Sequence, residues 1–507
     1  MGSVKDIEKV RVSREQYKKI CFFADFTNCL VLRYSSAAVK IYERWVIILY
    51  QFRMIIIGVE RERYNFAERW RWTLKKNVKR IIAFMTVIAM SLCLLASCGP
   101  SSGEEEQKSG TSSGITIFNS KMEIQDQLMS MAKKYTKETG VPVEVYYSSD
   151  TVSAHLATRY ASKNPYTLSM VDAKDVYSLA EEHAVDLSDQ KWVKDTDYAI
   201  AIDGKTYGFP VCVEARGIIY NANAIEKVTG KKFDPAKCRT LDQFKHWIDL
   251  CKKGGMKTPT GVMKEDWSLG NHYLAEVYEM REDPDTFVYD MSKNKIDLAK
   301  DERYNSLMDT FDVLMKNSYS RESAISAERE VTEQKLAEGE IAFMFGGNWD
   351  WSVLSAYDYT DGLGMMPIPQ NLKAGEDYNT KLTGGGSKYF FIDSSANTSD
   401  KQRQEAKDFL NWLVYNDEGQ KFMVDDCALV PAFSNIKLKA KDPLGQSVSE
   451  YTNAGKLVPN YNYLPDDHYA ILGAQFQKYL AEKTDRAGFA KEVVTYWKTK
   501  TLQKHEQ

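Results

Sequence analysis

Short apolar runs alternate with amphipathic helical patterns from residue 115 onward, and this alternation restricts the fold more than any other feature of the chain. Residues 115–118 predict a buried strand, and Ile124, Leu128, Met131 and Tyr135 then recur at the spacing of one helix face. The alternation continues with a strand, a helix and a strand over residues 143–146, 152–162 and 168–171. This order and spacing predict a parallel sheet with right-handed crossovers.

Polar residues follow the ends of the predicted strands. Ligands of parallel sheets bind at the carboxyl ends of strands, so we expect a crevice beside Asn119, Ser149, Asp150 and Asp172. Loop residues of these types also form turns and helix caps. The pattern therefore leaves both roles open for each of the four.

Three helix starts are predicted by capping boxes, in which a Ser or Thr is followed three residues later by Glu or Gln. These boxes are Ser120 with Glu123, Thr240 with Gln243 and Ser399 with Gln402.

The segment from Leu74 to Cys98 is built like a secretory signal. A basic start (Lys75, Lys76, Lys79 and Arg80) precedes an apolar run over 81–94, which is shorter than the about 20 residues that span a bilayer. Small residues follow, and Leu-Ala-Ser-Cys resembles a bacterial lipobox. The resemblance implies that Cys98 becomes the lipidated first residue of a lipoprotein on the outer face of the cell membrane, since a two-chain anchor is stable. The alternative is an ordinary membrane anchor, or a cleaved signal with an unrelated cysteine.

Residues 1–73 precede this signal, although signal peptides start near the N-terminus. We expect residues 1–73 to be an upstream extension outside the working protein, and residues 74–97 to be the signal peptide. A UUG start codon at Leu74 would give the signal an ordinary length. The alternative is a genuine N-terminal extension or a second membrane segment.

The charge of the chain is unevenly distributed. Residues 98–507 carry 49 Lys and Arg against 62 Asp and Glu, a net charge of −13, whereas residues 1–97 carry +10. An acidic domain of this kind is not expected to bind nucleic acid by electrostatics. The stretch 98–114 is rich in Gly, Ser and Glu and predicts a flexible tether.

The cysteines and histidines show no metal-site spacing. Cys212, Cys238, Cys251 and Cys427 follow Cys98 without a Cys-x-x-Cys pair, and the six histidines are scattered. We expect buried free thiols, with a Cys238–Cys251 disulfide as the alternative. No metal and no cofactor is predicted.

The stretch from Gly204 to Asn221 carries a family resemblance. A Gly-Lys turn leads to Pro210, and a strand with Glu214 and an Ile-Tyr-Asn ending follows. This resembles the extracellular solute-binding proteins of ABC importers, in the carbohydrate-binding group that includes maltose-binding protein. The resemblance implies that the strand crosses between two lobes and that Glu214 reaches a sugar. The alternative is a hinge carboxylate in an ion pair with Arg216.

The stretch from Leu336 to Trp351 resembles the same family, with a helix, a short strand and then Gly and Trp at a helix start. The resemblance implies that Trp349 stacks on a sugar, because pyranose C–H groups pack on aromatic rings while hydroxyls need carboxylates and amides. Asn348 and Asp350 are candidates for those polar contacts. We expect Gly346 and Gly347 to allow close approach of the backbone to a ligand, and Trp351 to pack in the core.

Further candidates come from loops that line the cleft in the family. Trp267 precedes a helix at a position where the family places a pocket aromatic, with core packing as the alternative. Gly385 lies in a Gly-Gly-Gly run that lacks the remainder of a phosphate-binding motif. Tyr461 and Tyr463 are expected to close over the ligand.

Together these features predict an α/β, two-lobed periplasmic-binding-protein fold of class II type with a hinge between the lobes. The chain would cross near Val213, near residue 375 and near residue 430, so that lobe 1 comprises residues 115–213 and 375–430, and lobe 2 comprises residues 214–374 and 431–507.

The resemblance implies a monomeric, lipid-anchored protein, not an enzyme, that delivers a carbohydrate to the permease subunits of an ABC transporter. The residues leave three alternatives open. The same fold could carry a polyamine or a peptide, since Asp150, Asp172, Glu214 and Asp350 would suit a cation. Two carboxylates could also make a surface glycosidase, although no common nucleophile motif occurs. The third alternative is a sensor subunit that signals to a kinase.

Overall fold

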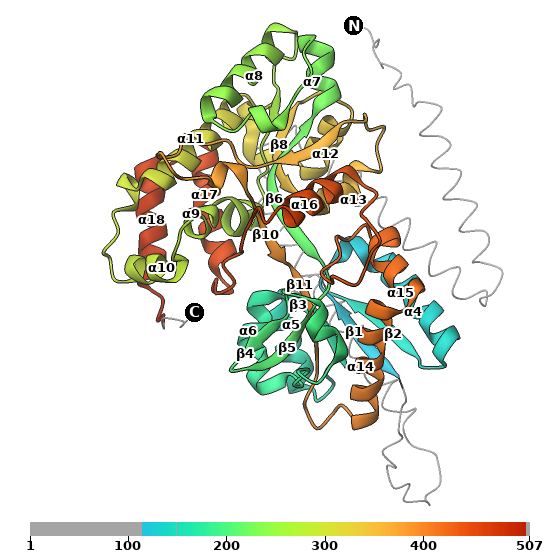
Figure 1. Cartoon of the computed structure of the whole chain (residues 1–507). Helices are drawn as coiled ribbons and strands as arrows, with labels where there is room; N and C mark the ends of the chain where they lie inside the picture. Colours follow the sequence, from blue (N-terminus) through green and yellow to red (C-terminus); the bar gives the residue numbers. More distant parts are fainter. Residues whose placement is uncertain (1–113, 149, 503–507) are drawn as a thin grey trace, which may run out of the picture. The chain divides into compact units, whose positions relative to one another are not determined.

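Two mixed β-sheets organise the part of the chain that the computed structural model describes, residues 114–148 and 150–502 (Figure 1). The expected extension, the signal peptide, Cys98, the tether up to residue 113 and Ser149 lie outside the described residues. Among the described residues, no helix has the length and apolar character needed to cross a bilayer. The mixed α/β fold with two sheets confirms the predicted fold class.

The first sheet has the strand order β2-β1-β3-β11-β5-β4. β1 pairs in parallel with β2 and β3, as the alternation of strands and helices predicts, and β11 pairs antiparallel with β3 and β5. The strand bounds are β1 Ile115–Asn119, β2 Val143–Tyr147, β3 Leu168–Asp172, β4 Ile200–Ile202, β5 Lys205–Pro210 and β11 Lys388–Ile392.

Helices cover both faces of this sheet because alternate strand residues point to opposite sides. Ile117 and Met170 belong to one apolar cluster with residues of α4 and α14, whereas Phe118 and Val171 belong to another with residues of α5 and α6. The helix bounds here are α4 Gln125–Thr139, α5 Val152–Ala161, α6 Ala173–His183, α14 Asp400–Tyr415 and α15 Asp417–Lys421.

The second sheet has the strand order β12-β10-β6-β8-β7, with β9 also paired to β6. β6 is its longest strand and is buried along nearly its whole length. The strand bounds are β6 Val213–Asn221, β7 Thr260–Gly261, β8 Phe343–Gly347, β9 Leu363–Met366, β10 Leu382–Gly386 and β12 Leu457–Val458.

A helical layer packs on the second sheet around an aromatic core that includes Tyr273, Phe311, Phe476 and Trp497. The rings of Phe311 and Phe476 lie 4.6 Å apart. The helix bounds of this layer are α7 Ala222–Thr229, α8 Leu241–Lys253, α9 Glu276–Glu279, α10 Pro284–Ser292, α11 Glu302–Lys316, α17 His468–Leu480 and α18 Arg486–Lys498. Buried residues of α12 Arg329–Ala337, α13 Trp351–Leu354 and α16 Pro443–Asn453 belong instead to the apolar cluster that contains Ile117 and Met170.

The chain passes between the two sheets at three places. It leaves β5 for β6 at residues 211–212, and it leaves β10 for β11 at Ser387. The third passage follows Val430, whose carbonyl accepts a hydrogen bond from Val213 N at 2.9 Å. We expected the second passage near residue 375, but β10 still pairs with β6, so residues 382–386 belong to the second sheet.

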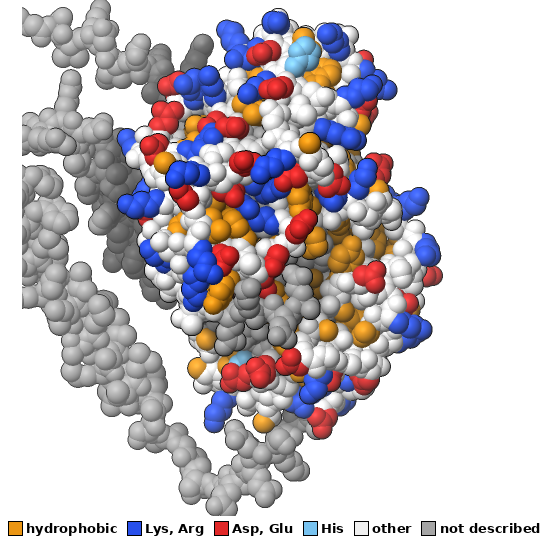
Figure 2. Space-filling model, turned by 60° about the vertical axis from the view of Figure 1, so that its left-hand side comes forward, with side chains coloured by type: hydrophobic (Ala, Val, Ile, Leu, Met, Phe, Trp, Pro, Cys, Tyr) orange, Lys and Arg blue, Asp and Glu red, His pale blue; other side chains and the backbone are white. Residues whose placement is uncertain are grey.

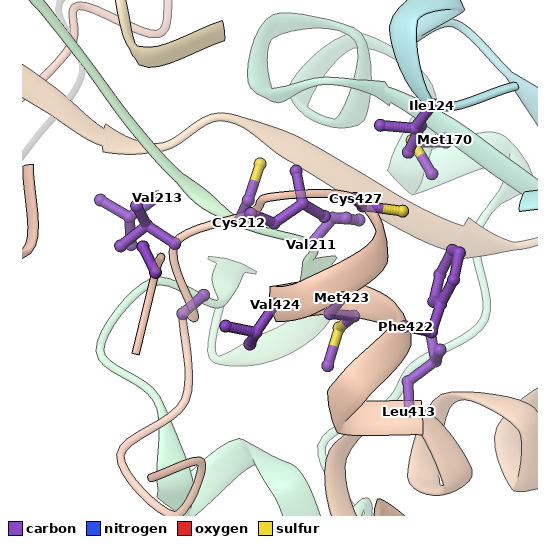
Figure 3. Packing of buried hydrophobic residues seen from close by; sticks show 14 of the residues in the cluster. Ile124, Met170, Val211, Cys212, Val213, Leu413, Phe422, Met423, Val424 and Cys427 are labelled. Atoms are coloured by element: carbon purple, nitrogen blue, oxygen red, sulfur yellow. The ribbon is translucent and has the colours of Figure 1, made fainter. Parts of the chain in front are cut away.

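Apolar side chains pack where these passages meet. Figure 3 shows Val211, Cys212 and Val213 passing over the helical segment that carries Met423 and Val424, and all five are buried. The passage at residues 211–212 therefore packs, through buried apolar side chains, on the helical segment that follows α15.

Two of the three predicted capping boxes form. Thr240 and Gln243 cap α8, and Ser399 and Gln402 cap α14. The box at Ser120 is wrong: Asn119 Oδ1 instead accepts from Lys121 N at 2.9 Å, and α4 begins only at Gln125 after a short 3-10 turn. The strand end therefore turns Lys121 inward, where its ammonium pairs with a carboxylate.

Charged side chains of both signs occur on the face shown in Figure 2. Basic and acidic side chains are interspersed there, with no large area of one sign.

Candidate functional site

The edge of the first sheet that faces the passages carries a charged pair. β3 ends at Asp172, and antiparallel β11 begins at Lys388, so the two residues are register partners. Lys388 Nζ lies 2.6 Å from Asp172 Oδ1. Burial acts to raise the pKa of Asp172, but the Lys388 ammonium holds it below its ordinary value. Asp172 therefore stays a carboxylate at this edge.

Two other polar residues expected at this edge have different surroundings. The Asn119 side chain is fully buried and is used by the turn, since its Nδ2 also donates to Lys121 O and Gln125 Oε1 at 2.9 Å. Asp150 is exposed, and its carboxylate accepts from Ser148 Oγ at 3.1 Å. The contacts of Asp150 do not reach Asp172.

Glu214 lies on β6 directly after the first passage and is 8% exposed. Its Oε1 accepts from Lys121 Nζ at 2.5 Å, and its Oε2 accepts from the Ser387 hydroxyl. The contacts join the turn after β1, the strand β6 and the second passage. The predicted alternative, a hinge carboxylate in an ion pair, has the partner Lys121 rather than Arg216.

Arg216 makes a separate buried network in the second sheet. Its Nε donates to Glu276 at 2.9 Å, Nη2 pairs with Glu279, and Nη1 donates to Asn460 Oδ1 at 2.8 Å. Thr383 of β10 donates to the other Glu276 oxygen at 2.5 Å. Burial raises the pKa of Glu276 to about 7, against the opposing effect of Arg216.

Three aromatic rings converge beside this network, and we call Trp267, His272 and Trp349 the aromatic cluster. The His272 ring centroid lies 5.2 Å from that of Trp267 and 4.8 Å from that of Trp349. The Arg329 guanidinium stacks over Trp267 at 4.6 Å. A π-helix, Ser268–Tyr273, carries His272, and such local widenings are frequent at functional sites.

The aromatic cluster holds polar atoms that lack partners. Trp349 Nε1 and His272 Nδ1 are both buried without a hydrogen-bond partner. Burial and the cations Arg216, Arg329 and Lys388 lower the pKa of His272 well below its ordinary value. His272 is therefore a neutral imidazole, and the pair offers an indole donor beside an imidazole nitrogen.

Oxygen atoms of the residues on either side of Trp349 hold its loop. Asp350 is 1% exposed, pairs with Arg329 through Oδ1 and accepts from Gly347 N at 3.0 Å through Oδ2. Asn348 Oδ1 accepts from Ala215 N at 3.0 Å. These contacts therefore fix the position of the Trp349 indole, so both residues can support ligand binding indirectly, through the tryptophan.

The glycines of this loop are needed for its own packing. A Cβ at Gly347 would lie 2.3 Å from the Trp349 ring, and one at Gly346 would lie 2.0 Å from Asp350 Oδ2. The atoms that closely approach Gly346 and Gly347 in this structure are therefore side-chain atoms of Asp350 and Trp349. In the Gly-Gly-Gly run, by contrast, a Cβ at Gly385 would make only ordinary van der Waals contact, with Asn460 at 3.9 Å and Tyr198 at 4.0 Å.

A cavity of about 430 Å³ lies beside the Arg216 network, and we call it the tyrosine cavity. Tyr177 of α6 lines it from the first sheet's helices, and Tyr461 and Tyr463 line it from the loop before α17. The Tyr177 and Tyr463 rings lie 4.9 Å apart. Asn460, which bonds to Arg216, forms part of the wall.

Trp351 packs outside this group, where its ring lies 5.0 Å from that of Tyr359 at 73°. It is only partly buried. We expected Trp351 to pack in the core, but the structure places it as a partly buried residue against the edge of an apolar cluster.

Sequence reasoning missed Lys121, His272, Arg329 and Lys388 as members of the site, and it considered Arg216 only as an ion-pair partner of Glu214. No local pattern marks them, since each becomes significant only through a partner distant in the sequence. The one available signal was Lys388, a charged residue at the start of an apolar strand next to the glycine run.

The remaining side chains bear on metal and redox chemistry. Among the described residues, no group of three or more His, Cys, Asp or Glu side chains is placed to hold a metal ion. Cys212, Cys238, Cys251 and Cys427 are free and buried, so the alternative Cys238–Cys251 disulfide does not form. Burial raises the pKa of Cys212 to about 12.

Comparisons with known proteins agree with this architecture. The family model described as bacterial extracellular solute-binding protein matches residues 130–454. A solved structure of the solute-binding protein RafE in complex with raffinose matches with a TM-score of 0.64 at 18% identity, covering 76% of this chain and 99% of that one.

Two further solved structures have the same fold. A binding protein MsmE from Bacillus subtilis, in an open conformation, matches with a TM-score of 0.61 at 19% identity, covering 76% of this chain and 97% of that one. A manno-oligosaccharide-specific solute-binding protein from Bifidobacterium animalis, in complex with mannotriose, matches with a TM-score of 0.55 at 17% identity, covering 76% and 94%.

Proposed function

Because the chain belongs to the bacterial extracellular solute-binding protein family, a family of non-enzymatic substrate-binding proteins, we propose that it binds an oligosaccharide beside Trp349 and delivers it to the permease of an ABC transporter. The observation that carries the proposal is the aromatic cluster with its two unpartnered polar atoms, Trp349 Nε1 and His272 Nδ1. A sugar ring suits such a site, because its C–H face packs on an indole while its hydroxyls satisfy the nitrogen atoms.

The charged residues around the cluster support an uncharged ligand at this place. Lys388 is paired with Asp172, Lys121 with Glu214, and Arg329 with Asp350. Each of these cations is thus already paired with a carboxylate of the protein. An acidic sugar could form an ion pair with one of them only by breaking the existing pair. Neutral hydroxyl groups can be bound without that cost.

Gly385 also lies where a ligand between the two sheets could contact it, since a Cβ there would meet Asn460 and Tyr198 only at 3.9 and 4.0 Å. Gly385 pairs with Glu214 in the register of β10 and β6, and Glu214 lies beside the passages between the sheets. A ligand at this point would contact both sheet-and-helix units. Such a ligand favours the closed arrangement, because only closure lets both units contact it.

The test is thermal unfolding of the purified protein against a panel of neutral oligosaccharides, monosaccharides, amino acids and acidic sugars. A ligand at 100 times its dissociation constant adds about 2.7 kcal/mol to the free energy of unfolding, which raises the midpoint measurably. A rise with neutral oligosaccharides that Trp349→Ala abolishes and Trp351→Ala retains supports the proposal. A rise with amino acids alone, or an unchanged response of Trp349→Ala, would contradict it.

We also propose that Cys98 carries the lipid anchor, on the resemblance of Leu-Ala-Ser-Cys to a lipobox. Mass spectrometry of the mature protein isolated from membranes tests this. A diacylated N-terminal Cys98 is the expected result, with release from the membrane in Cys98→Ala. A mature protein that begins upstream of Cys98, or one with an unmodified Cys98, would exclude it.

A further inference from the structure

The tyrosine cavity is a second candidate binding site, next to the aromatic cluster but separated from it by the Arg216 network. Its volume of about 430 Å³ lies within the range of small-molecule sites. Arg216 bonds to two of its wall residues, Glu279 and Asn460. The cavity therefore has walls of its own, and of its wall residues Tyr461 and Tyr463 were expected from the sequence to close over the ligand.

Aromatic rings form much of its wall. Tyr177, Tyr378, Tyr461 and Tyr463 all line it. The Tyr461 and Tyr463 rings lie 5.9 Å apart at 74°, and Tyr177 adjoins Tyr463 at 4.9 Å. The faces of electron-rich rings attract a positive group, and the Tyr378 ring of this wall already carries the Arg303 guanidinium at 4.4 Å.

The carboxylates of the cavity point to the same charge. Asp285 is only 9% exposed, and its Oδ1 accepts from the Tyr461 hydroxyl at 2.9 Å. Within residues 114–148 and 150–502, no Lys, Arg or His forms an ion pair with it. Glu279 shares Arg216 with Glu276, and Glu282 is exposed at the rim.

The two cations of the cavity wall pair with carboxylates other than Asp285, although the Lys381 ammonium also lies over the ring of Tyr378, another wall residue, at 5.7 Å. Arg281 pairs with Asp301 at 2.7 Å and stacks on Phe287 at 3.4 Å. Lys381 pairs with Asp377 at 2.9 Å. Neither neutralises Asp285, and a buried carboxylate without a cation is costly unless a ligand supplies one.

We propose that the tyrosine cavity binds a protonated amine, with the Asp285 carboxylate as its ion-pair partner and the tyrosine rings as its walls. An amine fits better than a metal ion, because no metal-binding group of three or more ligands occurs in the described part of the chain. The amine can belong to a small free ligand or to an amino sugar whose other rings reach the aromatic cluster. The inference goes beyond the proposed function and does not depend on it.

Calorimetric titration of the purified full chain at low salt tests the proposal with pairs of probes. Putrescine and ethanolamine are compared with ethylene glycol, and oligomers of glucosamine are compared with their N-acetylated forms, which carry no charge. The amine member of each pair is expected to bind about tenfold or more tightly than its neutral partner, since hydrogen bonds to charged groups are strong.

The variant Asp285→Asn removes the charge and keeps the oxygen that accepts from Tyr461. It is expected to weaken amine binding about tenfold or more. The matched control is Asp290→Asn on the same helix, because Asp290 pairs with Lys295 and does not line the cavity. Tyr461→Phe gives a second variant, which removes the hydroxyl that orients Asp285 and should also weaken amine binding.

The outcomes separate the two sources of amine and the two proposals. Amine binding that Asp285→Asn weakens and Trp349→Ala retains supports a small free ligand. Binding of glucosamine oligomers that both variants weaken supports one ligand across both sites. Equal binding of charged and neutral probes, or unchanged amine binding in Asp285→Asn and Tyr461→Phe, overturns the inference. Silence of every neutral oligosaccharide would count against the proposed function alone.

Discussion

The Lys121 ammonium lies 2.5 Å from the Glu214 carboxylate, and this buried pair joins the turn after β1 to the strand that begins the second sheet. Lys121 also lies 2.6 Å from Glu123. Burial opposes the charge of Lys121, but Glu214 and Glu123 raise its pKa well above the ordinary value. The pair is thus charged, and it sits at the junction on which the candidate site depends.

Glu214→Leu should destabilise the protein by about 3 kcal/mol, because it leaves part of the Lys121 charge uncompensated in a buried place. Chemical denaturation measures the change. The double variant Lys121→Met, Glu214→Leu should recover part of the loss. Lys134→Ala is the control, since its pair with Glu418 is exposed and should contribute less than about 1 kcal/mol. Equal losses from both pairs would refute the argument.

Gly347→Ala should weaken ligand binding by displacing the Trp349 ring, since the added methyl carbon would lie 2.3 Å from it. The affinity loss should be about tenfold or more, as expected for a misplaced aromatic contact. Titration of the best ligand in a double-mutant cycle with Trp349→Ala is the measurement. If Gly347→Ala weakens binding equally without the indole, the two residues do not act together.

His272→Phe should weaken ligand binding while keeping an aromatic ring in the cluster, because it removes the unpartnered Nδ1. The pKa of His272 is lowered by burial and by Arg216, Arg329 and Lys388, so the residue should not titrate between roughly pH 5.5 and 8. Affinity measured at both ends of that range should therefore agree in the unmodified protein. A loss of affinity at the acidic end that His272→Phe abolishes would contradict this account.

Glu276→Gln should change how stability depends on pH. The pKa of Glu276 in the folded state is about 7, above its ordinary value of 4.5. Between these two pH values the folded state therefore keeps a proton on this carboxyl that the unfolded state has lost. This carboxyl therefore stabilises the fold less as pH rises from 4.5 to about 7. The free energy of unfolding of Glu276→Gln should fall less across that window. Glu302→Gln, at an exposed position, is the control and should leave the profile unchanged.

Thr240→Ala should cost about 1 kcal/mol, because Thr240 Oγ1 accepts from Gln243 N at 3.2 Å at the start of α8. Ser120→Ala is the comparison at a position where the same motif does not form a cap. It should change the free energy of unfolding by less than about 0.5 kcal/mol. Thermal or chemical denaturation measures both changes. A larger loss of stability in Ser120→Ala would indicate that Ser120 does cap a helix, in contradiction to the structure.

Local patterns in the sequence were sufficient for most elements. The helical spacing from Ile124 to Tyr135 predicts α4, which ends at the left-handed Gly140, and the predicted strand over 168–171 corresponds to β3. Patterns of this kind depend on neighbours a few residues apart. The capping box at Ser120 failed because a distant carboxylate, Glu214, draws Lys121 inward instead.

The sequence predicted members of the candidate site only where a single residue type, such as a tryptophan that can stack on a sugar, indicates the function by itself. Trp349 and Glu214 could be identified from motifs, but Asp350 could not be distinguished from a ligand contact until Arg329 and the Gly347 amide were seen to occupy it. The tyrosine cavity was foreseen only through Tyr461 and Tyr463. Asp285 does not belong to any recognised sequence motif. It was singled out only because the structure shows it buried beside the cavity without an ion-pair partner among the described residues.

The amino-acid sequence alone carried the resemblance to the family, and its periodicity predicted the α/β class and the positions of most helices and strands, because these patterns involve residues close together in the chain. The tertiary structure alone decided the passage at Ser387, the partner of Glu214 and the neighbours of His272. Those features depend on which side chains meet after long stretches of chain are brought together. Burial then sets their charges, since the cost of an unpaired group is large only where water is excluded.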